Sequence, residues 1–143
     1  MVEAFQKLEL SFEFIYSLLA RVDERFSPKL STEFDLSDYA KKLQKRANCI
    51  IIEEKNGIVG FVFFYIIEPK QKSAYITLIC SLVNGYGKNL YAEFLNKLPS
   101  QINEILLEVD RSNHQALKFY DKLGFNEDIG NSKSGKIYLK HQL

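Results

Sequence analysis

Hydrophobic positions in the first third of the chain recur with the period of a helix. Between Ser11 and roughly Arg25 the apolar residues fall three or four positions apart, and they are Phe12, Ile15, Leu18, Leu19 and Val22. This spacing places them on one side of a helix, and Pro28 predicts where it ends. A second helix is predicted from Ser37, as its N-cap, to Ala47, with Tyr39 and Leu43 on its apolar side.

After this point the pattern changes to the short apolar runs that are typical of strands. Three strands are predicted, from Cys49 to Glu54, from Ile58 to Ile67 and from Ser73 to Cys80. The first two are joined by Lys55-Asn56-Gly57, whose residue types favour a hairpin turn. The three strands are therefore expected to form an antiparallel meander. Phe5 to Leu8 predicts a further short strand before the first helix.

The second half of the chain alternates between the periods of helix and strand. Its predicted elements are a helix that follows Gly85 and Gly87 and ends near Lys97, a strand from Glu104 to Val109, a helix from His114 to Leu123 that ends at Gly124, a hairpin around Asn131 to Gly135, and a last strand from Lys136 to His141. This order predicts an α+β fold with a mixed, mostly antiparallel sheet and helices on both faces. The unit from Ser73 to Val109 is expected to be a central, right-handed parallel β-α-β crossover.

Length and composition indicate the number of domains and the expected cellular compartment. The chain has 143 residues, which suits one domain from residue 1 to residue 143. Its net charge of +1 does not give the basic surface of a nucleic-acid-binding protein. Cys49 and Cys80 lack metal-ligand spacing and are interpreted as buried, reduced residues. Because no signal peptide or membrane-length apolar run is evident, we expect a soluble cytoplasmic protein without metal, membrane or nucleic acid.

One segment has the residue types of a phosphate-binding loop. It runs from Ser81 to Leu90, and its glycines, Gly85 and Gly87, allow a ligand to approach the backbone closely. The N–H groups at the start of the following helix suit a phosphate. A pair of glycines before a helix is also typical of an ordinary turn, so both interpretations stay open at this point.

A second segment, from Leu107 to Phe125, combines a strand, a polar turn and an amphipathic helix. If both faces of the strand are covered, Glu108 is a partly buried carboxylate, and burial would raise its pKa toward that of a useful base. Tyr120 falls on the apolar side of the helix, where the simplest interpretation is a core tyrosine. Asn113 is most simply a helix cap, and His114 is interpreted as a surface residue.

Within this second segment the spacing follows a longer pattern. Its members are Leu107-Glu108-Val109, Asn113, Ala116, Phe119-Tyr120 and Leu123-Gly124-Phe125. The pattern resembles the C-terminal motif of the GCN5-related N-acetyltransferases, the GNAT family, and is especially similar to that of the ribosomal-protein N-terminal-alanine acetyltransferases. The run Asn84-Gly85-Tyr86-Gly87-Lys88-Asn89 lies where the family has its pyrophosphate loop. There the chain departs from the family at both ends of the run, with Asn84 for Gln or Arg and Asn89 for a second Gly or Ala.

The resemblance, which covers roughly Cys49 to Phe125, implies an acetyl-CoA-dependent N-acetyltransferase. Acetyl-CoA would lie where the strands Ser73–Cys80 and Glu104–Val109 splay apart. The residues implied in binding it are Leu78, Ile79, Gly85, Tyr86, Gly87, Lys88, Asn89, Leu90, Asn113 and Lys122. Glu108 would take the proton of the acceptor amine and Tyr120 would protonate the departing thiolate, in a direct attack without an acyl-enzyme.

Three alternatives stay open beside this interpretation. The altered phosphate loop favours a CoA-binding regulatory module that lost turnover, the donor can be another acyl-CoA, and the fold can belong to a structural protein. The acceptor is expected to be a small-molecule amine or a protein N-terminus, and the mixed charges of Ser11 to Ala47 and Gly130 to Gly135 do not decide between them. A homodimer that pairs through the final strands also fits the sequence.

Overall fold

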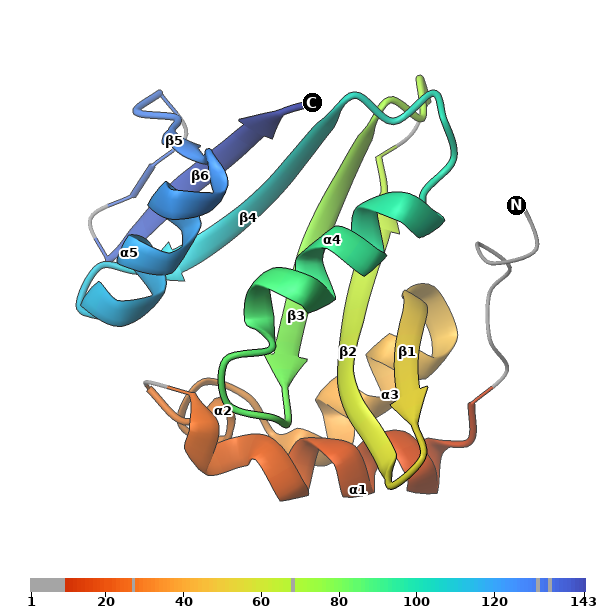
Figure 1. The fold of residues 1–143 in the computed structure, drawn as a ribbon. Coiled ribbons are helices and arrows are strands. Elements are labelled where there is room, and N and C mark those ends of the chain that lie inside the picture. Colours follow the sequence, from red (N-terminus) through yellow and green to blue (C-terminus); the bar gives the residue numbers. More distant parts are fainter. Residues whose placement is uncertain (1–9, 27, 68, 131, 134) are drawn as a thin grey trace.

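One mixed sheet of six strands forms the centre of the molecule (Figure 1). The computed structural model describes residues 10–143 except 27, 68, 131 and 134, so the strand predicted at Phe5 to Leu8 lies outside the described residues. In spatial order the strands are β1 (Asn48–Glu54), β2 (Gly57–Ile66), β3 (Ser73–Ser81), β4 (Glu104–Asp110), β6 (Lys136–Gln142) and β5 (Asn126–Glu127). All neighbours are antiparallel except β3 and β4, which are parallel. The predicted fold class is therefore confirmed.

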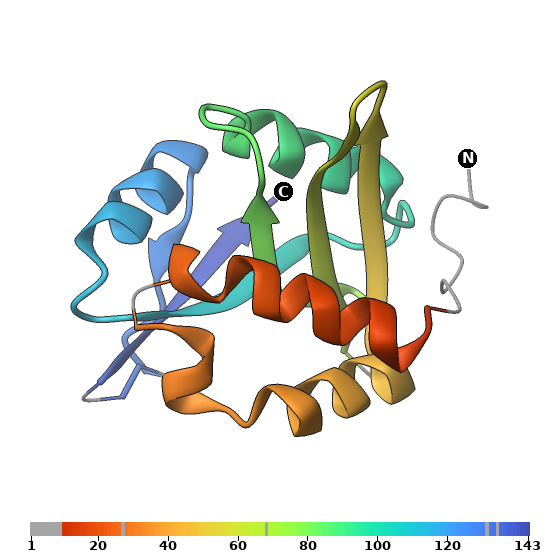
Figure 2. The ribbon, with the colours of Figure 1, turned by 90° about the horizontal axis from the view of Figure 1, so that it is seen from below.

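Helices cover both faces of the sheet, as predicted. They are α1 (Phe12–Val22) with the short 3₁₀ helix η2 (Asp23–Arg25), α2 (Leu30–Glu33), α3 (Leu36–Arg46), α4 (Gly87–Lys97) and α5 (His114–Leu123). Figure 2 shows α1 and α3 lying side by side on one face of the sheet, with α4 on the other. The positive φ of 104° at Gly124 confirms the predicted cap of α5.

Two details of the first helices differ from the sequence prediction. The predicted N-cap Ser37 lies inside α3, and the cap is Asp35, whose Oδ1 accepts a hydrogen bond from the Asp38 N–H at 3.0 Å. Asp and Ser cap helices about equally well, so residue type alone could not choose between them. The four-residue helix α2 was not predicted, because it is too short to show a helical period.

Each face of the sheet has its own hydrophobic core. The core under α1 and α3 includes Leu19, Leu43, Phe61, Phe63 and Leu78, and the core under α4 and α5 includes Phe64, Leu90, Phe94, Ile105 and Leu107. Each of these ten side chains is less than 5% exposed. Burial contributes roughly 2 kcal/mol for each large apolar side chain, so the two cores hold the helices against the sheet.

A β-bulge in β3 lies at the point where the sheet opens. Phe63 pairs with Leu78 and Phe64 with Ile76, so Thr77 has no partner residue on β2. As a result Ile76 packs in the core under α4 and α5, while Leu78 packs in the core under α1 and α3. The pairing of β3 with β4 ends at Tyr75 and Leu106, and the two strands then diverge toward their C-terminal ends (Figure 1).

Candidate active site

A cavity of about 480 Å³ lies between the diverging ends of β3 and β4. Its walls include Leu90, Phe119 and Tyr120 from one face of the sheet, and Phe26, Leu30 and Glu33 from the other. The opening therefore passes between the strands and connects the two faces. Such a concave site at the ends of parallel strands is a common place for a ligand.

Seven of the residues predicted for the site line this cavity. They are Leu78, Ile79, Gly87, Leu90, Glu108, Asn113 and Tyr120. The other predicted residues are not among its lining residues, and they are Gly85, Tyr86, Lys88, Asn89 and Lys122. Both lysines implied in binding acetyl-CoA, Lys88 and Lys122, are in this second group.

The loop before α4 has the backbone geometry of a tight turn. Gly85 adopts a φ of +80°, which only glycine reaches without strain. Gly87 begins α4 and faces Phe119, because a Cβ there would lie 3.1 Å from the Phe119 Cζ. The free N–H groups of the first turn of α4 and the positive end of the helix dipole present a partial positive charge. This turn contains no acidic residue that would offset the charge.

Asn113 immediately precedes α5. Its Oδ1 accepts a hydrogen bond from the Ala116 N–H at 3.1 Å, which makes it the N-cap of the helix. It is thus a helix cap, as its residue type suggested, and it lines the cavity as well. His114 is exposed at the first position of the helix and is not among the lining residues.

Tyr120 reaches the cavity from α5 and is only 9% exposed. Its ring packs against Phe119 and Phe125, with centroids 5.2 and 5.3 Å away. Its hydroxyl makes no hydrogen bond to any residue that the structure describes. Burial raises the pKa of this phenol, and the Cys80 thiol acts in the same direction. Tyr120 is therefore protonated at neutral pH and has a proton to donate.

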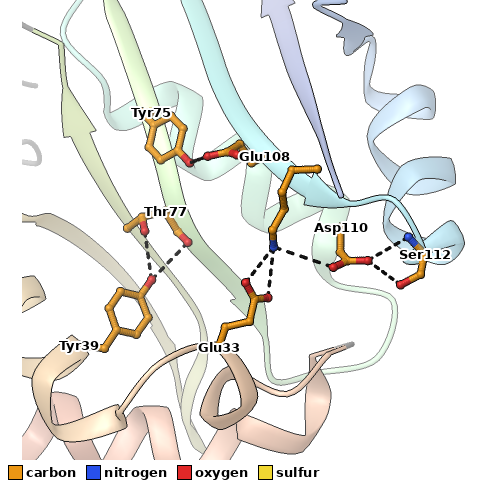
Figure 3. Close-up of polar contacts among 8 residues, drawn as sticks. Glu33, Tyr39, Tyr75, Thr77, Glu108, Asp110 and Ser112 are labelled. Carbon is orange, nitrogen blue, oxygen red and sulfur yellow. Dashed lines mark hydrogen bonds and ion pairs between the residues drawn. The ribbon is translucent and has the colours of Figure 1, made fainter. Parts of the chain in front are cut away.

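Glu108 lies on the opposite face of β4 from the buried Leu107 and Val109. The expectation that it is partly buried is wrong, because its side chain is exposed. Among the described residues, no helix covers this face of β4 and β6 as α1 and α3 cover β1 to β3 (Figure 2). Glu108 is held instead by Tyr75 of β3, whose hydroxyl donates a hydrogen bond to Oε1 at 3.0 Å (Figure 3). Burial raises the pKa of the Tyr75 phenol, and Glu108 adds to the effect.

An ion network that the sequence did not reveal lies beside Glu108 (Figure 3). The Lys136 ammonium of β6 donates to both Glu33 oxygens, at 2.9 and 3.2 Å, and lies 4.0 Å from Asp110 Oδ2. The Ser112 hydroxyl and N–H donate to Asp110 Oδ1, and these bonds lower the pKa of Asp110. Glu33 and Lys136 are 103 residues apart, so no local signal predicts their contact.

Two side chains from the helical segment before β1 make contacts beside the cavity. The Tyr39 hydroxyl of α3 lies 3.0 Å from the Thr77 hydroxyl at the bulge (Figure 3). The Arg25 guanidinium of η2 donates to the Ser81 and Leu82 carbonyls, at 3.3 and 3.5 Å. Arg25 also lines the cavity, so a cation lies at the C-terminal end of β3, where no cation was predicted.

Comparison with known proteins identifies the class of this fold and site. The model of the acetyltransferase (GNAT) family matches residues 12–125, which is most of the chain. The chain therefore belongs to the GNAT family of acetyltransferases. It is an acyltransferase of the N-acetyltransferase class, with acetyl-CoA as donor. A search of curated proteins finds no match.

Solved structures agree with this membership. The PaiA N-acetyltransferase of Thermoplasma acidophilum in complex with coenzyme A is 17% identical, over 95% of this chain and 97% of that one, with a TM-score of 0.71. The ribosomal-protein-S18-alanine N-acetyltransferase of Escherichia coli is 19% identical, over 76% and 77%, with a TM-score of 0.59. A Bacillus anthracis protein in complex with acetyl coenzyme A is 26% identical, with a TM-score of 0.55, and the match covers 68% of this chain but 63% of that one.

Within residues 10–143, leaving out 27, 68, 131 and 134, no helix is long and apolar enough to cross a membrane. Nor do these residues include a group of three or more His, Cys, Asp or Glu side chains placed to hold a metal ion. Cys49 and Cys80 are both buried, and burial raises the pKa of their thiols to about 12 and about 11.

Proposed function

We propose that this protein transfers the acetyl group of acetyl-CoA to a primary amine by direct attack in a ternary complex. The observation that supports this most is the position of Glu108 and Tyr120 on the walls of one cavity. The first lies on the exposed face of β4 and the second on the α5 side of the sheet. The amine and the thioester can thus approach each other from opposite faces.

The groups proposed to bind acetyl-CoA lie along β3 and at the start of α4. Beyond Tyr75 no described residue of β4 pairs with β3, so the backbone around Leu78 and Ile79 can pair with an extended ligand as a strand would. The first-turn N–H groups of α4, from Gly87 onward, suit the pyrophosphate. Arg25 is the cation that lines this end of the cavity, whereas Lys88 and Lys122 do not line it.

The proposed chemistry needs two proton transfers. The neutral amine nitrogen attacks the thioester carbonyl carbon, so that an N–C bond forms and the C–S bond breaks. Glu108 takes the proton that the amine nitrogen loses, directly or through one water, and the Tyr120 hydroxyl protonates the departing thiolate sulfur. The products are the N-acetyl amine and CoA, and exchange with solvent restores both side chains. Each transfer typically contributes roughly 10²- to 10⁴-fold to the rate.

Thiol release from acetyl-CoA over a panel of primary amines tests this function, with mass spectrometry of the acetylated product. Glu108→Gln and Tyr120→Phe are expected to lower kcat by roughly 10²-fold or more, while CoA still binds. Matched control changes outside the cavity are Glu53→Gln on β1 and Tyr16→Phe on α1, both exposed, and these are expected to leave kcat unchanged. Full turnover of a good acceptor by Tyr120→Phe would remove that residue as the acid.

A second candidate function is a CoA-binding module without turnover. The departures of the loop at Asn84 and Asn89 from the family pattern favour it. The same assay separates the two functions once CoA binding is measured by calorimetry. Binding of CoA without thiol release for any amine in the panel would favour the module. Faster thiol release from another acyl-CoA than from acetyl-CoA would instead show that the other acyl-CoA is the preferred donor.

A further inference from the structure

The bulge in β3 decides how the last residues of this strand face the cavity. Thr77 is the extra residue of the bulge, and it lines the cavity. Its hydroxyl meets Tyr39 of α3, and Leu78 packs in the core under α1 and α3, so two consecutive residues face the same side of the sheet. In a regular strand consecutive residues face opposite sides. The bulge thus reverses the alternation for the residues of β3 that follow it.

This reversal concerns the part of β3 that is proposed to bind acetyl-CoA. In a strand the backbone N–H and C=O groups of successive residues point to opposite edges. The register of the bulge therefore decides whether Leu78 or Ile79 offers its N–H to the edge that β4 leaves open beyond Tyr75. A shift of one residue would exchange these groups and turn their side chains to the other face.

Tyr39 of α3 is joined to the bulge by two polar contacts (Figure 3). Its hydroxyl donates to the Thr77 carbonyl oxygen at 3.3 Å and lies 3.0 Å from Thr77 Oγ1. Among the described strand pairs Thr77 has a partner residue on neither β2 nor β4. A carbonyl at such a position needs a donor from elsewhere, and the Tyr39 hydroxyl supplies one. The Thr77 hydroxyl can donate to the Tyr39 oxygen in return, which closes the pair.

The Tyr39 side chain is itself held in a fixed position. It is 6% exposed, and its ring stacks on Phe34 with centroids 4.5 Å apart and planes 20° apart. Burial raises the pKa of its hydroxyl to about 12, so the hydroxyl keeps its proton and can donate it to a hydrogen bond. Tyr39 is not among the residues that line the cavity. Its influence on a ligand therefore passes through Thr77.

We infer that Tyr39 is a positioning residue for acetyl-CoA. By holding Thr77 in the bulge, its hydroxyl keeps the following residues of β3 in the register that pairs with the pantetheine arm, the extended part of CoA. This inference rests on the proposed function. Because Tyr39 takes no part in proton transfer, loss of its hydroxyl weakens donor binding more than it slows the reaction of the bound donor.

Tyr39→Phe tests the inference, because it removes the hydroxyl alone. The Kd of CoA is expected to rise roughly three- to tenfold, the worth of one hydrogen bond. Adenosine 3′-phosphate 5′-diphosphate, which is CoA without the pantetheine arm, is expected to bind as it does to the unmodified protein. The KM of acetyl-CoA should rise with the Kd of CoA while kcat changes less. An unchanged Kd of CoA in the folded variant, or an equal loss for the nucleotide, overturns the inference.

Thr77→Val removes the partner hydroxyl and keeps the carbonyl. It is expected to raise the Kd of CoA by a smaller factor, roughly two- to threefold, since one of the two contacts remains. In the Tyr39→Phe background the same change is expected to add little, because the contact is already lost. Losses that add in the double variant would show that the two residues act independently, and the inference would fail.

Ile15→Val is the matched control for a loss of stability. Ile15 is 1% exposed in the same core as Tyr39 and does not line the cavity. The control is expected to lower the midpoint of urea unfolding and to leave the Kd of CoA unchanged. If it weakens CoA binding as much as Tyr39→Phe does, the effect of Tyr39 is a general loosening and the inference fails.

The inference stays testable if Tyr39→Phe does not fold, because the Kd of CoA for Thr77→Val is then compared with that for Ile15→Val, and equal values overturn it. The outcomes also separate this inference from the proposed function. Binding of CoA is measured without turnover, so a Kd that Tyr39→Phe leaves unchanged removes the inference alone. If the unmodified protein binds CoA but releases no thiol with any amine, the proposed function itself fails.

Discussion

The hydrogen bond from the Tyr75 hydroxyl to Glu108 joins two strands whose backbones have already begun to diverge. Tyr75 is the last residue of β3 that pairs with β4, and its hydroxyl lies 3.0 Å from Glu108 Oε1. A hydrogen bond donated to a carboxylate also fixes the direction in which the carboxylate points. Tyr75 is thus a positioning residue that acts through Glu108.

Tyr75→Phe is expected to lower kcat about three- to tenfold, because Glu108 loses the hydrogen bond that holds its carboxylate in place. In the Glu108→Ala background the same change is expected to have little effect, since the carboxylate that Tyr75 positions is absent. Rate measurements with the two single variants and the double variant give both values.

A merely structural role for Tyr75 would lower kcat by the same factor with and without the Glu108 carboxylate. Tyr16→Phe, an exposed change on α1, is the reference for removing a phenol elsewhere. An equal loss of kcat in the Glu108→Ala background, together with a folded protein, would show that the hydrogen bond does not influence the base.

Single-residue predictions from sequence succeeded where a local rule decides them. Asn113 and Gly124 lie at the ends of α5 as their residue types predict. Glu108 was predicted to be partly buried and is exposed, because its burial depends on which helices cover β4 and not on the strand itself. Tyr75 was not singled out, since its contact joins residues 33 positions apart.

Among the elements, α4 lies close to the sheet because β2 has a glycine beneath it. A Cβ on Gly60 would lie 3.0 Å from Leu90 Cδ2 and 3.2 Å from the Cys80 carbonyl oxygen. Leu90 is fully buried and also lines the cavity. The space at Gly60 therefore sets the distance between α4 and the cavity wall.

Gly60→Ala is expected to lower the free energy of unfolding by about 1–3 kcal/mol, because overpacking forces neighbouring atoms to shift. The added methyl group can displace Leu90, but the backbone carbonyl of Cys80 cannot yield as easily. CoA affinity is expected to fall as well, since α4 moves. Urea unfolding and calorimetry measure the two effects.

Gly135→Ala is the matched control, because a Cβ there meets nothing within 4 Å and its φ is not positive. It is expected to change neither the free energy of unfolding nor CoA binding by a measurable amount. If Gly60→Ala behaves like this control, the close approach of α4 to the sheet does not depend on Gly60.

Elements were predicted well wherever a long hydrophobic period marks them. The strands β1 to β4 and the helices α4 and α5 begin and end within two residues of their predicted bounds. The bulge at Thr77 and the helix α2 were missed, because a one-residue shift of register and a single helical turn leave no periodic signal. Thr77 and the α2 residues Leu30 and Glu33 all line the cavity, so the site was predicted less completely than the fold.

At the scale of the whole molecule, the part of the cavity wall that holds Glu33 and Lys136 is assembled from segments near both ends of the chain. Glu33 of α2 meets Lys136 of β6 across 103 residues of sequence. The family motif predicted Glu108 and Tyr120 because both belong to one continuous segment. It could not predict Glu33, Lys136 or Arg25, since each enters the site only through the tertiary fold.

The buried thiols and phenols make the stability of the whole molecule sensitive to alkali. Burial raises the pKa of Cys49 to about 12, of Cys80 to about 11 and of Tyr39 to about 12. A thiol in the unfolded chain ionises near its reference pKa of about 8.5 and a phenol near about 10. Above these values the unfolded chain loses protons that the folded protein keeps, so stability falls as pH rises.

The free energy of unfolding is therefore expected to decline above about pH 8.5, where thiols of the unfolded chain ionise. The decline should steepen above about pH 10, where phenols ionise as well. Each buried group contributes at most about 1.4 kcal/mol per pH unit between its unfolded and folded pKa. Urea unfolding under reducing conditions measures the curve. Cys49→Ala, which removes one thiol, is expected to flatten the first part of the decline, and an unchanged slope would show that Cys49 ionises equally in both states.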